Sequence, residues 1–215
     1  FLWSFGIPPL ALPFNLVVLV VVYSMKLRSR VDWFFANPFA DGTPETNFWR
    51  FHSQRTRFPD AVEPSLQLPF AGERLITQAF DGPITHQGDW RHAFDFEATD
   101  KEGRKHSGPG DSLADFYTFG SEILAPVDGT VVKVIDHVKD NPIGRNNLAE
   151  NWGNLVVIQL ETGMAVQLSH FKHKGVMVYE GQPVTAGTLL GYCGNSGRSP
   201  VPHLHFQAQA TAVVG

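Results

Sequence analysis

The sequence predicts a mostly β protein whose folded part, residues 69–215, is an antiparallel β-sheet or β-barrel-like domain. Short apolar segments of about four to eight residues recur there and are separated by turn signals. The chain contains 20 glycines and 15 prolines, and its valines are clustered, which is typical of turn-rich β proteins. These observations favour a sheet with many short connections over a helical bundle.

Eight strands are predicted, in chain order. They cover residues 74–79, 92–97, 122–125, 130–136, 155–160, 164–170, 188–193 and 203–209. Asp128-Gly129 marks one turn, and Glu161-Thr162-Gly163 joins two strands as a hairpin. Two long polar inserts, residues 100–119 and 137–153, interrupt the strands, and inserts of this length either form functional walls or are mobile.

Composition excludes some classes of function. The 215 residues suffice for one domain plus appendages, and 17 basic against 21 acidic side chains give a net charge of −4. Without a basic excess, we expect no nucleic-acid partner. Cys193 is the only cysteine, so an internal disulfide cannot form.

The first 25 residues predict a transmembrane segment. Residues 1–23 are almost wholly apolar, close to the roughly 20 residues that a spanning helix requires, although three prolines interrupt the first half. Basic residues follow the apolar run rather than precede it, which disfavours a signal peptide. Because the chain does not begin with Met, we expect the tail of a truncated membrane protein here. Residues 26–68 are then expected to be a linker with one short helix.

Four residues on three predicted strands carry side chains suited to metal or acid–base chemistry. His203 and His205 are separated by one residue, so on a strand they share a face while Leu204 faces the core. Asp95 lies between two phenylalanines and must point to a polar pocket, a metal or solvent. His170 ends an apolar strand. A catalytic zinc takes three such protein ligands, but solvated or structural roles remain open for each residue on pattern alone.

Several short segments of the sequence, taken in chain order, resemble the lysostaphin/LytM-type zinc metalloendopeptidases. Five ordered blocks carry the resemblance: THQG with AFDF (85–88, 93–96), LAPVDGTVV (124–132), WGNLVVI (152–158), LSH (168–170), and GYCGNSG with PHLHF (191–197, 202–206). The resemblance implies a duplicated-hybrid-motif β fold, one Zn²⁺ per domain and peptide substrates from peptidoglycan. It also implies that His86, Asp95 and His205 bind zinc. His170 and His203 would be the catalytic imidazoles, one a general base and the other a stabiliser of the transition state.

One departure concerns the first ligand. The commoner family pattern places a histidine four residues before the aspartate, where this chain has Arg91. His92, three residues before Asp95, would lie on the opposite face of the strand. His86 is nine residues before Asp95, a spacing that requires an intervening loop. Because some family members resemble this chain in that longer spacing, we predict His86 rather than His92.

A second, shorter resemblance concerns the N-terminal stretch. The segment GIPPLALPFNL (6–16) is similar to the closing segment of bacterial urea transporters, which implies a transporter fused to the peptidase domain. The basic residues Lys26, Arg28 and Arg30 would place the following domain in the cytoplasm by the positive-inside rule. A peptidase acting on cell walls must face outward. We therefore expect an inner-membrane anchor with the peptidase domain on the periplasmic side.

Two other readings of the β domain stay open at this point. A non-catalytic accessory or regulatory domain of the transporter would keep the fold without turnover. The segment APVDGTV (125–131) is also similar to phosphocarrier, lipoyl and biotinyl domains. A lipoyl or biotinyl domain needs a lysine at a hairpin tip, which the 161–163 turn lacks. A phosphocarrier does not need a metal ligand such as Asp95.

Overall fold

The computed structural model describes residues 65–87, 90–209, 212 and 214. The predicted transmembrane segment at residues 1–25, and most of the predicted linker at 26–68, lie outside these residues. So does the stretch that resembles a urea transporter. Among the residues that are described, no helix combines the length and apolar character needed to cross a membrane.

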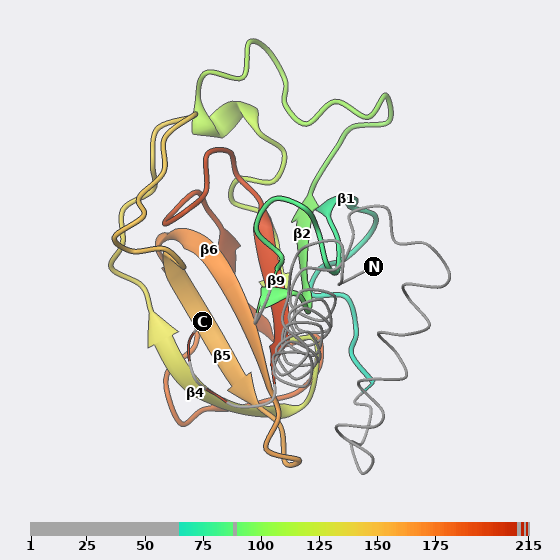
Figure 1. Ribbon diagram of the computed structural model, residues 1–215, viewed down its shortest axis with the longest axis vertical. Coiled ribbons are helices and arrows are strands. Elements are labelled where there is room, and N and C mark those ends of the chain that lie inside the picture. Colours follow the sequence, from blue (N-terminus) through green and yellow to red (C-terminus); the bar gives the residue numbers. More distant parts are fainter. Residues whose placement is uncertain (1–64, 88–89, 210–211, 213, 215) are drawn as a thin grey trace, which may run out of the picture.

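The described chain folds into one antiparallel sheet, as predicted, with nine strands instead of the eight expected (Figure 1). Its strands are β1 (Leu75–Gln78), β2 (Ala93–Glu97), β3 (Glu122–Leu124), β4 (Gly129–Ile135), β5 (Asn154–Gln159), β6 (Ala165–Val176), β7 (Pro183–Val184), β8 (Leu189–Cys193) and β9 (Leu204–Gln209). The order across the sheet is β1-β2-β9-β6-β5-β4-β7, while β8 pairs with both β3 and β6. A short 3₁₀ helix, η4 (Leu113–Asp115), lies in the first insert.

All eight predicted strands are present, with three differences. The two-residue β7 was not predicted, because two residues carry no periodicity. β6 continues to Val176 instead of ending at His170. The last strand begins at Leu204, so the prediction that His203 lies within it is wrong: pairing with β2 ends where Leu204 lies opposite Phe96.

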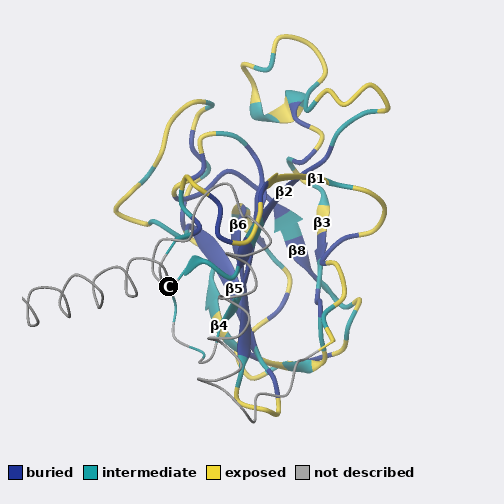
Figure 2. Ribbon diagram, turned by 45° about the vertical axis from the view of Figure 1, so that its right-hand side comes forward, coloured by how far each residue is buried: buried dark blue, intermediate teal, exposed yellow. Residues whose placement is uncertain are grey.

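The core lies on one face of β2 and β9. Phe96, Leu204 and Phe206 are buried in the main apolar cluster, to which β5 and the buried first half of β6 also contribute (Figure 2). Burying each such side chain contributes about 1.5–3 kcal/mol. Because side chains alternate along a strand, Asp95 and His205 are directed to the other face, as the sequence predicted. The apolar residues thereby determine where the polar ones point.

The insert at residues 137–153 is a hydrogen-bonded wall beside the loop that precedes β9. The carboxamide of Asn154 accepts a hydrogen bond from the backbone N–H of Val138 (2.8 Å) and donates one to its carbonyl (2.8 Å). Asn141 Nδ2 donates to the carbonyl of Gly197 at 2.7 Å. Both asparagines are buried, so these bonds hold the insert against the loop that carries Ser196 and Ser199.

Candidate metal centre

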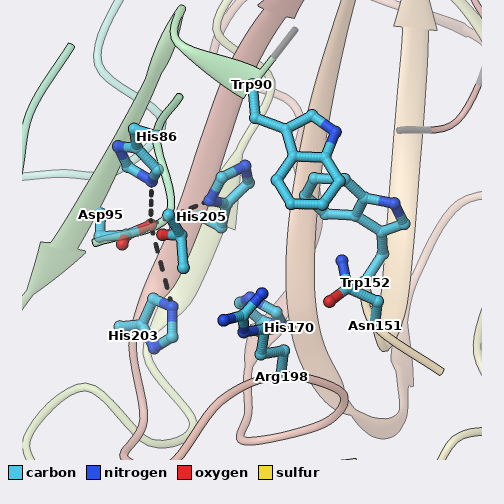
Figure 3. A pocket seen from close by; sticks show the side chains of 10 residues that line it. His86, Trp90, Asp95, Asn151, Trp152, His170, Arg198, His203 and His205 are labelled. Atoms are coloured by element: carbon cyan, nitrogen blue, oxygen red, sulfur yellow. Dashed lines mark hydrogen bonds and ion pairs between the residues drawn. The ribbon is translucent and has the colours of Figure 1, made fainter. Parts of the chain in front are cut away.

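Five residues singled out in the sequence line a single pocket. They are His86, Asp95, His170, His203 and His205, and the remaining lining residues are Thr85, Trp90, Asn151, Trp152 and Arg198 (Figure 3). β2 supplies Asp95 and β9 supplies His205, and the two lie opposite each other in the antiparallel ladder. His86 comes from the turn after β1, and His170 from β6. Segments far apart in the chain therefore meet at one point.

Two imidazole nitrogens converge on one carboxylate oxygen. His86 Nε2 lies 3.2 Å from Asp95 Oδ1, and His205 Nδ1 lies 2.9 Å from the same oxygen. The possible ligand atoms of these three buried residues all lie within 4.8 Å of one another. Among the described residues, this is the group of three or more His, Cys, Asp or Glu side chains placed closely enough to hold a metal ion.

In His86 and His205, the ring nitrogen that points away from Asp95 makes a hydrogen bond of its own. That bond determines whether the nitrogen facing Asp95 carries a proton. His86 Nδ1 is 3.0 Å from the carbonyl of Ala79, and since a carbonyl only accepts, Nδ1 carries the proton. His205 Nε2 donates to Gln207 Oε1 at 3.2 Å, and that amide is oriented by its own donation to Gln209 Oε1. In the neutral rings, His86 Nε2 and His205 Nδ1 therefore present lone pairs to a carboxylate.

Such an arrangement requires a positive charge between the three atoms. His86 Nε2 is fully buried and has no hydrogen-bond donor or acceptor as partner. Either a second proton on one ring or a metal ion can supply the charge. Two imidazoles and one carboxylate match the donor set of a catalytic zinc, so the residues fit this metal.

Asp95 is held in its ionised form. Burial raises the pKa of Asp95. A proton on the facing nitrogen of His205 or His86 would hydrogen-bond the carboxylate and, together with nearby His203, outweigh burial and hold this pKa far below its usual range. The second carboxylate oxygen, Oδ2, accepts a hydrogen bond from Gln78 Nε2 at 3.0 Å. An ionised carboxylate with one oxygen directed at two imidazoles is the form that a metal ligand requires.

His170 and His203 form a second pair of imidazoles beside the triad. Their ring centroids are 4.7 Å apart, and His203 Nε2 lies 3.8 Å from Asp95 Oδ1. His170 Nδ1 donates to the carbonyl of Ser196 at 2.7 Å, and His203 Nδ1 donates to that of Val201 at 2.9 Å. Each ring is thereby left with an unprotonated Nε2 that can accept a proton.

Burial keeps His170 neutral and the backbone fixes its direction. Desolvation lowers the pKa of His170 well below its usual value, and the neighbouring His203 and His205 lower it further. His170 has a φ of 68°, in the left-handed region that residues other than glycine enter at some cost. The pairing of β6 is irregular directly after it, between Phe171 and Val176. A strand with regular geometry would direct this side chain elsewhere.

His92 lies outside the pocket. Its ring packs on that of Phe80, with centroids 5.0 Å apart, and the metal-compatible group contains His86 instead. The loop from Ala79 to Thr85 brings His86 back to Asp95 despite the nine-residue spacing. Burial and the adjacent Arg91 lower the pKa of His92, which is consistent with packing on an aromatic ring.

The rim of the pocket contains residues for which the sequence predicted no role. Trp90 and Trp152 pack edge to face with ring centroids 5.1 Å apart. The ring centroid of Trp152 also lies 5.3 Å from that of His205. Arg198 is exposed and lines the pocket from the loop before β9. A Trp-Gly-Asn and a Gly-Arg-Ser segment mark two of these positions in the sequence, but their spacing alone does not place them near the histidines.

Comparison with known proteins gives one family match. Residues 113–213 match the model of peptidase family M23, a stretch that includes His170, His203 and His205 and begins after His86 and Asp95. No curated protein matches the sequence.

Three of the solved structures that match this chain at low identity are peptidases. A zinc-containing peptidase from Vibrio cholerae is 22% identical, with 70% of this chain and 39% of that chain covered and a TM-score of 0.45. Lysostaphin from Staphylococcus simulans is 18% identical, with 72% and 49% covered and a TM-score of 0.46. The M23 metalloprotease pseudoalterin, from the deep sea, is 19% identical, with 71% and 75% covered and a TM-score of 0.46. The chain thus spans well under half of the Vibrio cholerae protein.

Proposed function

We propose that the protein whose residues 113–213 match peptidase family M23 is a zinc metalloendopeptidase acting on peptidoglycan cross-links. The observation that carries this proposal is the convergence of His86 Nε2 and His205 Nδ1 on Asp95 Oδ1, at 3.2 and 2.9 Å. Two lone pairs and a carboxylate that face one another in a buried pocket need a cation between them. These three residues would be the zinc ligands.

The second pair of imidazoles would move the protons. Bound zinc would supply Lewis-acid polarisation of water and of the scissile carbonyl. His170 and His203 each offer an unprotonated Nε2, so one accepts the proton of the attacking water. The other ring would donate a hydrogen bond to the developing oxyanion only when its Nε2 is protonated, because its Nδ1–H is bound to a backbone carbonyl. The proton taken from water would then pass to the leaving amine. The low pKa of His170 keeps it available as a base at neutral pH.

The rim of the pocket would bind the substrate. Trp90 and Trp152 form an apolar wall beside His205, which suits the small apolar side chains of cell-wall peptides. The guanidinium of Arg198 makes no ion pair with any residue in the described part of the chain, and it points into the pocket (Figure 3). A free cation at this place would pair with a substrate carboxylate.

Domain organisation and localisation extend the same proposal. Residues 1–25 would anchor the protein in the inner membrane as part of a urea-transporter-like chain, residues 26–68 would form the linker, and residues 69–215 the peptidase domain. The apolar composition of residues 1–23 supports the anchor. A peptidoglycan substrate requires the domain to face the periplasm. Cleavage of the domain by protease added to spheroplasts, but not to intact cells, would support this orientation.

Zinc content provides the first test. We expect one zinc per natural chain, retained in His92→Ala and lost in His86→Ala, measured by metal analysis after dialysis. Release of peptides from purified peptidoglycan should follow the same order. Absence of zinc from the natural chain would refute the enzyme assignment and would leave a metal-free accessory domain. Loss of zinc only in His92→Ala would refute the ligand set.

A further inference from the structure

We infer that Gln78 is a positioning residue that sets the metal affinity of this site by tying Asp95 to the turn that carries His86. This inference rests on the metal site of the proposed function. Gln78 is the last residue of β1 and is buried, with 8% of its surface exposed. It is not one of the three residues that could bind the metal, which are His86, Asp95 and His205.

The carboxamide of Gln78 uses all four of its hydrogen-bonding positions. Nε2 donates to Asp95 Oδ2 at 3.0 Å and to Thr85 Oγ1 at 2.6 Å. Oε1 accepts from the backbone N–H groups of Ile84 at 3.0 Å and Thr85 at 2.8 Å. A glutamine amide has two N–H donors and two acceptor lone pairs, so the group is saturated. A buried amide in this state has one low-energy orientation.

These bonds act on both sides of the triad. Because Asp95 Oδ2 is bound to Gln78, the other oxygen, Oδ1, is left to face His86 and His205. The remaining three bonds hold the two residues directly before His86, whose ring is also bound through Nδ1 to the carbonyl of Ala79. One side chain thereby fixes the separation of a carboxylate and an imidazole that come from different elements.

An irregularity in β1 places Gln78 where it can do this. Ile76 pairs with Phe96, so a regular register would put Thr77 opposite Asp95, yet the structure pairs Gln78 with Asp95. Since side chains alternate, the one-residue shift brings Gln78 to the face that bears Asp95. The turn then packs closely on it, since a Cβ at Gly82 would lie 2.3 Å from Gln78 Cγ.

Gln78→Met tests the inference, because methionine keeps the length and volume but removes all four hydrogen bonds. Outer residues that orient metal ligands typically contribute 10–100-fold to affinity, so we expect a zinc Kd raised by about 10–100-fold. The Kd is measured by competition with a chromogenic chelator. Gln182→Met is the matched control. The side chain of Gln182 accepts one hydrogen bond, from the N–H of Tyr179, in a turn away from the pocket, so the zinc Kd of this variant should not change.

A structural role and a positioning role give different results. If Gln78 only stabilised the fold, Gln78→Met would lower the melting temperature in EDTA and leave the zinc Kd within about twofold of natural, which would overturn the inference. If that variant does not fold, Thr85→Val removes one acceptor of Gln78 and should still weaken zinc binding by about threefold or more. An unchanged zinc Kd in Thr85→Val would also overturn the inference about Gln78. A natural chain without zinc would instead refute the proposed function.

Discussion

Replacing Asp95 by asparagine should abolish zinc binding and yet stabilise the metal-free protein. The asparagine can orient its Oδ1 toward Gln78 Nε2, which now donates to Asp95 Oδ2 at 3.0 Å. Its Nδ2 then takes the place of Asp95 Oδ1, 3.2 Å from His86 Nε2 and 2.9 Å from His205 Nδ1. Two N–H groups would meet two imidazole lone pairs, where the natural chain has a carboxylate oxygen.

The expected magnitude follows from these two contacts. Each new hydrogen bond contributes about 0.5–1.5 kcal/mol, so Asp95→Asn should raise the free energy of unfolding of the metal-free form by about 1–3 kcal/mol. For a domain of this size that corresponds to roughly 2–10 °C in melting temperature. The natural protein should gain about 2.7 kcal/mol when zinc is present at 100 times its Kd, and the variant should gain nothing.

The assay is thermal unfolding at pH 8, with EDTA and with zinc. The control is Asp111→Asn, which makes the same chemical change at an exposed position and should alter neither curve. Destabilisation of Asp95→Asn by more than about 1 kcal/mol in EDTA would refute the assignment of the ring protons. It would show that an imidazolium proton, rather than a pair of lone pairs, faces the carboxylate of the natural chain.

Three further predictions concern the imidazole pair and the rim. His203→Ala should retain zinc but lose about 10²-fold or more in kcat, measured on a cell-wall peptide, and full activity would contradict its role in proton transfer. Because the pKa of His170 is lowered in the folded protein, the unfolded chain binds the extra proton first. Stability of the metal-free form should therefore fall as pH drops below about 6.5, by at most about 1.4 kcal/mol per pH unit, and His170→Gln should reduce this slope in urea unfolding at pH 5–8. Arg198→Gln should raise KM about tenfold for peptides with a free carboxylate and leave amidated peptides unchanged, whereas an equal effect on both would exclude pairing with a carboxylate.

Most of the fold could be predicted from local patterns. Alternation along residues 93–97 and 204–209 indicates both strands and the faces on which Phe96, Asp95 and His205 lie, because side-chain direction in a strand depends only on the neighbouring backbone. Glycine and proline signals separate the strands well enough that the predicted ends differ mostly by one or two residues. β6 is the exception, since a bulge near its middle has no periodic signature.

The sequence by itself therefore determined the sheet and the polar face of β2 and β9, and its short motifs contain the four histidines that line the pocket. Tertiary structure decided which of them meet. The shifted register in β1 places Gln78 opposite Asp95, and the loop it holds returns His86 across nine residues. The left-handed backbone at His170 and the meeting of Trp90 with Trp152 likewise depend on packing between distant segments. Strand alternation is a property of adjacent residues, whereas these contacts arise only when separate elements pack and bury their polar groups together.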